Sequence, residues 1–183
     1  MPKIIENLDV EILRQAQFII GQKSLEELTM RDLARSCDVA LGTIYNYYPT
    51  KETLLEALIR DYWEQQFIQF DDLTKRDERS VYQKLEIIYS SVETFFAQYK
   101  EMMKQVYASQ PLPKTMSRAP VVEALLHRLE VLIQQAQDTA EIKATLLSRD
   151  LATFVLSNFS SMAKMKLMKF DTFENILRAL LQP

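Results

Sequence analysis

The residues of this chain whose types and spacing best suit a chemical task lie between Thr29 and Lys51, in the stretch TMRDLARSCDVALGTIYNYYPTK. Hydroxyl, amide and cationic side chains recur there among small and apolar ones. Such polar groups donate and accept hydrogen bonds, so they suit contacts with phosphate oxygens and with the edges of bases. The stretch therefore indicates recognition of nucleic acid by directed hydrogen bonds.

Enzymatic chemistry has no comparable support in the sequence. No nucleophile stands at a recognisable spacing from a base, and neither a phosphate-binding loop nor a metal-ligand cluster occurs. One histidine and one cysteine cannot form a zinc site without several carboxylates. We therefore expect no enzyme, no metal site and no cofactor.

Two short helices joined by a tight turn must position the polar groups of this stretch. Thr29 suits the N-cap of the first helix, with Asp32 three residues on in a capping-box arrangement. Leu41 to Tyr47 form the second helix, Pro49 ends it, and Thr50 can cap the next one. The residues predicted to face inward are Leu33, Ala34, Val39 and Ile44. Apolar inward and polar or aromatic outward positions describe a helix-turn-helix.

The same stretch resembles the TetR family of regulators, with unbroken spacing. The matching residues are Thr29, Leu33, Ala34, Val39, Gly42, Thr43, Ile44, Tyr45, Tyr47, Tyr48, Lys51, Glu52 and Leu54. Ser24, Cys37, Asp38 and Ala40 depart from the family pattern. Asp38 replaces a turn glycine, and aspartate tolerates the left-handed backbone region, so the turn should survive. Ala40 replaces a capping serine, which costs about 1 kcal/mol of helix stability.

The resemblance implies one set of contacts with base edges, and the chemistry of the side chains predicts a second set with phosphates. The residues expected nearest the base edges are Arg31, Leu41, Gly42, Asn46 and Tyr47. The residues expected at phosphates are Thr43, Tyr45, Tyr47 and Lys51, and Thr29 completes the expected DNA-binding set. Arginine can pair with guanine through two hydrogen bonds, whereas leucine offers only an apolar surface. For Tyr48, packing inside the module is the alternative.

Charge limits how such a module binds DNA. The chain has a net charge of −3, and residues 1–60 hold seven Lys and Arg against nine Asp and Glu. A protein that coats nucleic acid through bulk positive charge is therefore excluded, and binding must come from directed contacts. The single cysteine permits no internal disulfide and suits a reducing cytoplasm. We expect a cytoplasmic protein without a signal peptide or a membrane span.

Apolar residues recur at helical spacing through the rest of the chain, and there are only two glycines. We therefore expect an all-α protein. An N-terminal three-helix module at residues 1–49 is joined to a larger helical ligand-binding and dimerisation body at residues 50–183 by a long helix that begins near Thr50. Breaks between helices are expected at residues 74–80, 111–120 and 138–142.

The TetR resemblance implies a homodimer on a palindromic double-stranded DNA operator, formed by the last two helices at about residues 143–166 and 170–182. Aromatic and methionine side chains in the middle of the chain suit an adaptable apolar pocket, although they equally suit an ordinary core. The residues expected to line such a pocket are Trp63, Phe67, Phe95, Tyr99, Met103 and Tyr107. The single histidine, His127, fits an exposed helix position better.

Two functions remain open at this point. The first is a repressor released from its operator by a small, mainly apolar effector of weak or no charge. The second is a partner-binding or structural DNA-binding protein that uses the same module without a small-molecule inducer. An enclosed dry cavity would favour the first, and a filled body with an exposed apolar patch would favour the second.

Overall fold

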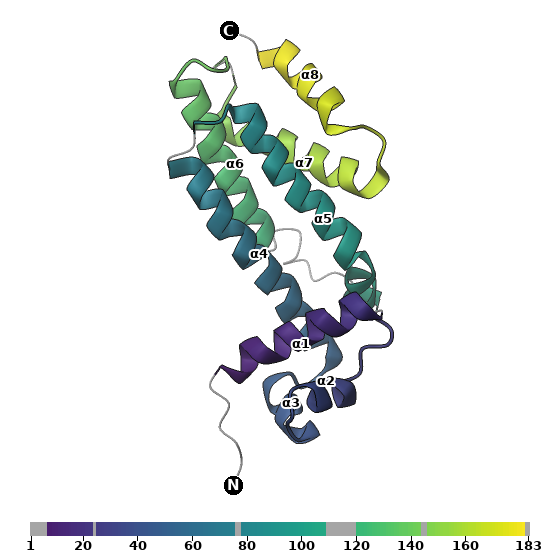
Figure 1. The fold of residues 1–183 in the computed structure, drawn as a ribbon. Coiled ribbons are helices and arrows are strands. Elements are labelled where there is room, and N and C mark those ends of the chain that lie inside the picture. Colours follow the sequence, from purple (N-terminus) through teal and green to yellow (C-terminus); the bar gives the residue numbers. More distant parts are fainter. Residues whose placement is uncertain (1–6, 24, 76–77, 109–119, 144–145, 182–183) are drawn as a thin grey trace. The chain divides into compact units, whose positions relative to one another are not determined.

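The computed structural model describes residues 7–23, 25–75, 78–108, 120–143 and 146–181, without the side chains of residues 101–108. In these ranges the chain is all-helical, as expected, and contains no strand (Figure 1). The helices are α1 (Leu8–Gln22), α2 (Met30–Ser36), α3 (Leu41–Tyr47), α4 (Lys51–Lys75), α5 (Val81–Ala108), α6 (Pro120–Asp138), α7 (Ser148–Met165) and α8 (Phe170–Leu181). None of the helices in the described ranges is long and apolar enough to cross a membrane.

The chain divides into two compact units. The first unit holds Met1–Tyr62 and Glu101–Pro111, and the second holds Trp63–Lys100 and Leu112–Pro183. The long helix α4 passes from the first unit to the second between Tyr62 and Trp63. The expected helix-turn-helix module at residues 1–49 lies wholly within the first unit.

The first unit has a small apolar core formed by its short helices. α2 packs against both α1 and α3. The buried side chains of these helices are Leu8, Ile12, Ala16, Ile19, Met30, Leu33, Ala34 and Ile44. The inward positions predicted for α2 and α3 are among them, and Val39 in the turn is half-buried. Each helix thus turns one apolar face inward, as short amphipathic helices must do to form a stable unit.

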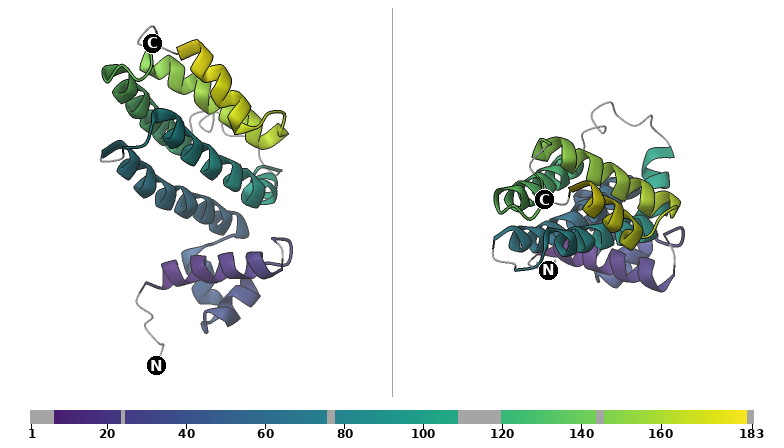
Figure 2. Two further views of the ribbon diagram at one scale, coloured as in Figure 1. Left: turned by 45° about the horizontal axis from the view of Figure 1, so that its top comes forward. Right: turned by 90° about the horizontal axis from the view of Figure 1, so that it is seen from above.

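The second unit is held together largely by aromatic packing. α6 packs along α7, and α8 folds back onto α7 (Figures 1 and 2). The ring centroids of Phe159 on α7 and Phe173 on α8 are 5.5 Å apart, and those of Phe159 and Tyr89 on α5 are 5.3 Å apart. These separations fall in the range that aromatic pairs prefer. Phe159 is completely buried and joins three helices.

A bidentate ion pair also joins α4 to α6. Arg128 donates from Nε and Nη2 to the two carboxylate oxygens of Asp71, at 2.8 and 3.1 Å. Its guanidinium carbon lies 4.2 Å from the ring centroid of Phe67, and its Nη1 donates to the carbonyl of Ala124. Arg128 therefore contacts α4 through two side chains one helical turn apart.

The helix α7 begins later than the sequence predicts. It starts at Ser148 rather than near residue 143, because the chain after α6 forms a turn with Ala140 at a φ of 56°. The buried side chain of Gln137 donates to the carbonyl of Leu146, and the Lys143 amide donates to the Leu181 carbonyl at 3.0 Å. The connection between α6 and α7 is thus held to the last turn of α8.

Candidate DNA-binding site

The N-terminus of α2 is capped by Thr29, as predicted. The Thr29 hydroxyl oxygen accepts a hydrogen bond from the Asp32 amide at 3.1 Å, and the hydroxyl donates to the Asp32 carboxylate at 2.7 Å. Asp32 thus reaches back to the side chain of Thr29. The cap fixes the start of α2 and so the position of Arg31, which is exposed in its first turn.

The turn between α2 and α3 is built from Cys37, Asp38 and Val39. Asp38 has a φ of 54°, so the aspartate occupies the left-handed conformation that the sequence requires there. The Val39 amide donates to the Ala34 carbonyl at 3.0 Å and closes the turn. The Cys37 side chain is buried, and this burial raises the pKa of its thiol. The departures at positions 37 and 38 are therefore accommodated.

Helix α3 has the bounds predicted from the sequence, Leu41–Tyr47. Ile44 is fully buried, whereas Tyr45 and Tyr47 are 44% and 47% exposed. Gly42 and Asn46 are also exposed, and Leu41 and Thr43 are half-buried. The residues predicted to read DNA on this helix thus share an accessible surface, with Ile44 anchoring the opposite side.

Lys51 opens α4 but also makes a contact that the sequence did not indicate. Its Nζ donates to the Leu25 carbonyl at 2.9 Å, which joins the start of α4 to the connection after α1. Burial lowers the pKa of this ammonium. An ammonium has three N–H donors, so one is used inside the unit. The residues lie 26 positions apart, so no local pattern points to the contact.

The start of α4 carries a reciprocal cap. The Thr50 hydroxyl accepts from the Thr53 amide and the Thr53 hydroxyl accepts from the Thr50 amide, both at 3.2 Å. Thr50 therefore caps the helix as predicted. Tyr48, just before it, is half-buried, and burial raises the pKa of its phenol.

Ion pairs engage several cations of the first unit. Arg14 pairs with Glu11 at 2.7 Å and Arg35 with Asp32 at 3.3 Å. Within the part of the chain that the structure describes, Arg31 has no hydrogen bond or ion pair. Its exposed guanidinium is therefore available to an external acceptor.

Four of the residues predicted to line an effector pocket pack against one another in the second unit. The ring centroids of Trp63 and Phe95 are 5.0 Å apart, those of Phe95 and Tyr99 5.3 Å apart, and those of Trp63 and Phe67 6.0 Å apart. Trp63, Phe95 and Tyr99 are buried and Phe67 is half-buried. The side chains of Met103 and Tyr107 lie outside the described part. His127 is exposed on α6, as predicted.

Comparisons with known proteins agree with this geometry. Residues 12–58 match the family described as bacterial regulatory proteins, tetR family. YuxN of Bacillus subtilis (strain 168), an uncharacterised HTH-type transcriptional regulator, is 26% identical over 107 residues, which are 57% of this chain and 35% of YuxN. This chain thus spans about a third of that relative. YvdT of the same organism, described likewise, is 21% identical over 177 residues, 96% of this chain and 91% of YvdT.

Solved structures show the same fold. The transcriptional regulator FadR from Bacillus subtilis, solved in complex with stearoyl-CoA, aligns with a TM-score of 0.65 and 18% identity over 94% of this chain and 96% of its own. AibR, solved with isovaleryl coenzyme A and operator DNA, aligns with a TM-score of 0.54 and 17% identity over 97% and 99% of the two chains. At these identities the likeness concerns the fold.

A helix-turn-helix with a capped first helix and an exposed second helix, followed by a larger set of long helices, has the architecture of the helix-turn-helix class of DNA-binding domains. The match over residues 12–58 and the named relatives make the assignment more specific. The helix-turn-helix of this chain is thus similar to that of the TetR family of bacterial regulatory proteins over residues 12–58.

Proposed function

We propose that this chain is a homodimeric repressor that binds a palindromic operator through α2 and α3 and is released by a small effector. The observation that carries the proposal is the exposed surface of α3, where Tyr45, Tyr47 and Asn46 are accessible. The apolar core of this unit is small, so leaving two tyrosine rings exposed costs it burial that would stabilise the fold. AibR, which has this fold, was solved with operator DNA, and that supports the same use of the module here.

The expected DNA contacts follow from the accessible groups of the first unit. Arg31 has its donors available and suits a guanine edge, and Asn46 suits an adenine edge. A Cβ added at Gly42 would meet nothing within 4 Å, so packing inside the chain does not require glycine there. A close approach of DNA to the backbone would explain it. Lys51 retains two donors for a phosphate.

The dimer is proposed to form through α7 and α8. Four large apolar side chains of these helices are exposed in the single chain: Phe154, Met165, Ile176 and Leu180. Ser157 and Ser161 on α7 are also exposed, so a partner helix could approach closely, whereas Ala163 is buried within the chain. A second copy related by a two-fold axis would cover this face and place two helix-turn-helix modules on one operator.

The effector is proposed to act by a population shift. If the effector prefers a dimer whose two helix-turn-helix modules are wrongly spaced for the operator, it lowers the affinity for DNA. DNA then lowers the affinity for the effector by the same factor. The long helix α4 is the expected link, since Lys51 stands at its start and the packed rings of Trp63 and Phe67 lie further along it. FadR and AibR were solved with acyl-CoA ligands, whose acyl chains are apolar and whose coenzyme A part is charged, which supports an effector with an apolar part.

The alternative is a DNA-binding protein whose body recruits a different protein. The exposed apolar side chains of α7 and α8 would serve such a partner as well as a second copy. The solution mass separates the two, because the repressor hypothesis requires twice the mass of one chain at micromolar concentration.

Selection of bound sequences from a random DNA pool tests the proposed function. We expect a palindrome whose half-sites lie about 34–36 Å apart, one helical turn of DNA. Arg31→Ala should change the preferred base, by about 1–3 kcal/mol of discrimination, whereas Lys51→Ala should weaken all sequences alike and lower the salt slope by about 1. A pool with no enriched sequence, at any salt concentration that keeps the protein folded, would refute the proposal.

A further inference from the structure

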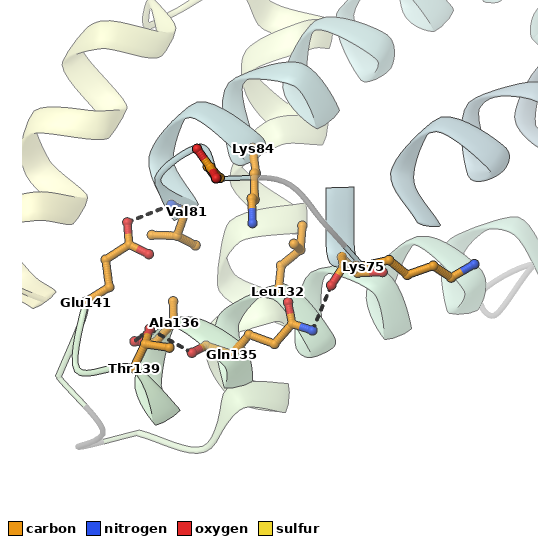
Figure 3. A pocket seen from close by; sticks show the side chains of 10 residues that line it. Lys75, Val81, Lys84, Leu132, Gln135, Ala136, Thr139 and Glu141 are labelled. Atoms are coloured by element: carbon orange, nitrogen blue, oxygen red, sulfur yellow. Dashed lines mark hydrogen bonds between the residues drawn. The ribbon is translucent and has the colours of Figure 1, made fainter. Parts of the chain in front are cut away.

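A cavity of about 550 Å³ lies in the second unit, where α4 ends, α5 begins and α6 ends (Figure 3). Its apolar floor is made by Val81, Leu132 and Ala136, all of them buried. Its polar residues are Thr74, Lys75, Glu78, Lys84, Gln135, Thr139 and Glu141. The volume lies in the range of small-molecule sites, and the polar wall beside an apolar floor suits a ligand with a polar and an apolar end.

Hydrogen bonds within the chain hold much of the polar wall in place. Glu141 accepts from the Val81 amide at 2.7 Å. The Gln135 side chain donates to the Thr74 carbonyl at 3.0 Å, and the Thr139 hydroxyl donates to the Gln135 carbonyl at 3.0 Å (Figure 3). These bonds fix the shape of the cavity from α4, α5 and α6 together, and they engage a carboxylate oxygen of Glu141.

The ammonium of Lys84 is placed differently. Lys84 is half-buried, and Figure 3 shows its nitrogen directed into the cavity, whereas the nitrogen of Lys75 points away. Among the described residues, no hydrogen bond or ion pair engages the ammonium of Lys84, whose backbone amide donates to the Ser80 carbonyl. The first turn of α5, which carries Lys84, has no acidic residue. A partly desolvated cation without a partner favours an anionic ligand.

We propose that this cavity binds a small amphipathic carboxylate, with the carboxylate on Lys84 and a short alkyl chain on Val81, Leu132 and Ala136. The site shares no residue with the packed rings of Trp63, Phe67, Phe95 and Tyr99, so it is separate from the pocket expected in the sequence. Lys84 selects for a ligand with a negative charge, and the apolar floor selects for a ligand with an alkyl chain.

The cavity is connected to the helices proposed to form the dimer. A carboxylate on Lys84 brings negative charge into the same cavity as Glu141, which accepts from the Val81 amide at the start of α5. Two residues on, the Lys143 amide is bonded to the last turn of α8 at Leu181. Occupancy would thus bias the connection that ties α6 to α8. This consequence for DNA binding rests on the proposed function, whereas ligand binding itself does not.

Titration calorimetry of the full chain with hexanoate tests the site, with hexanamide, acetate and inorganic phosphate as comparison probes. We expect saturable binding of hexanoate, and weaker binding of neutral hexanamide and of short acetate. Lys84→Met should weaken hexanoate at least about tenfold, the effect of losing one charge-assisted hydrogen bond. Lys84→Arg should retain binding, and Lys169→Met, which removes an exposed lysine between α7 and α8, should leave it unchanged.

Several outcomes would overturn the site. These are no saturable binding of hexanoate, equal binding by Lys84→Met, and equal affinity for hexanoate and phosphate, which would remove the role of the apolar floor. Thermal unfolding of each variant shows that it is folded. Operator binding without any probe is measured separately, so a chain that binds hexanoate but no DNA refutes the proposed function and not the site.

Discussion

The two units use aromatic side chains in opposite ways. On α3 of the first unit, Tyr45 and Tyr47 are nearly half exposed, whereas Trp63, Phe95 and Phe159 of the second unit are almost fully buried. Burying large rings stabilises a fold, so a small unit that leaves two tyrosines in water forgoes stability that it could have had. The rings on α3 are therefore available to an external partner, as is Phe154 on α7 at 45% exposed, whereas Trp63, Phe95 and Phe159 serve the packing of the second unit.

Both units combine polar contacts between near neighbours with contacts between distant residues, such as Lys51 with Leu25 in the first unit. Thr29 and Asp32, like Thr50 and Thr53, bond across three residues in the first unit. In the second unit Arg128 and Asp71 lie 57 positions apart. Short-range bonds set where helices begin, while long-range bonds set which helices meet.

The largest expected effect comes from the buried rings. Phe159→Ala should lower the free energy of unfolding by about 3–5 kcal/mol, because it removes a fully buried ring that joins α5, α7 and α8. Tyr45→Ala should change it by no more than about 0.5 kcal/mol and still abolish operator binding. Urea denaturation followed by tryptophan fluorescence gives both values. An equal loss of unfolding free energy in the two variants would contradict the difference between the buried and the exposed rings.

The ion pair of the second unit should come next. Arg128→Lys keeps the charge but loses the bidentate geometry and the stacking on Phe67, so we expect about 1.5 kcal/mol of destabilisation. Asp71→Asn should act similarly, and the double variant should cost less than the sum of the two single ones because both remove the same contact. Strict additivity in the same denaturation assay would mean that the pair contributes nothing as a pair.

The N-cap of α2 should matter less for stability. Thr29→Ala is expected to cost about 1 kcal/mol, whereas Thr29→Ser, which keeps the hydroxyl, should cost much less. Amide hydrogen exchange in α2 locates the effect. Faster exchange spread evenly over both units, rather than concentrated in the first, would contradict a local role for the cap.

The smallest effect concerns pH. Hydrogen bonds from Arg14 lower the pKa of Glu11 from 4.5 to about 2, with help from Gln15. A depressed carboxyl pKa stabilises the folded chain at neutral pH, and this contribution is lost as the pH falls from about 4.5 towards 2. Arg14→Met should raise the pKa of Glu11 towards its ordinary value, as measured by NMR titration of the side-chain carboxyl. An unchanged value would assign the shift to another group.

The sequence predicted the features of the first unit that depend on near neighbours in the chain. The caps at Thr29 and Thr50, the bounds of α3 and the left-handed Asp38 were all predictable, because each depends on residues within one or two turns. The contact of Lys51 with Leu25 was not, since the two residues lie 26 positions apart and no local pattern joins them.

In the second unit the sequence predicted helices and buried faces but not their junctions. The late start of α7 depends on Gln137 and Lys143 finding backbone partners beyond their own helix. The cavity around Lys84 depends on three helix ends meeting. Such features have no periodic pattern in the chain, whereas aromatic composition predicted a pocket at Trp63 and Phe95.

Alkylation of the buried thiol of Cys37 can report how often the turn between α2 and α3 opens in the native chain. Cys37 is the single cysteine, and its burial and raised pKa both suppress alkylation. Labelling by iodoacetamide must therefore wait until the turn between α2 and α3 opens, so the labelling rate measures how often the helix-turn-helix comes apart. Operator DNA that keeps the helix-turn-helix closed should slow the labelling of Cys37. The labelling rate would then report how long DNA stays bound, without an attached fluorophore.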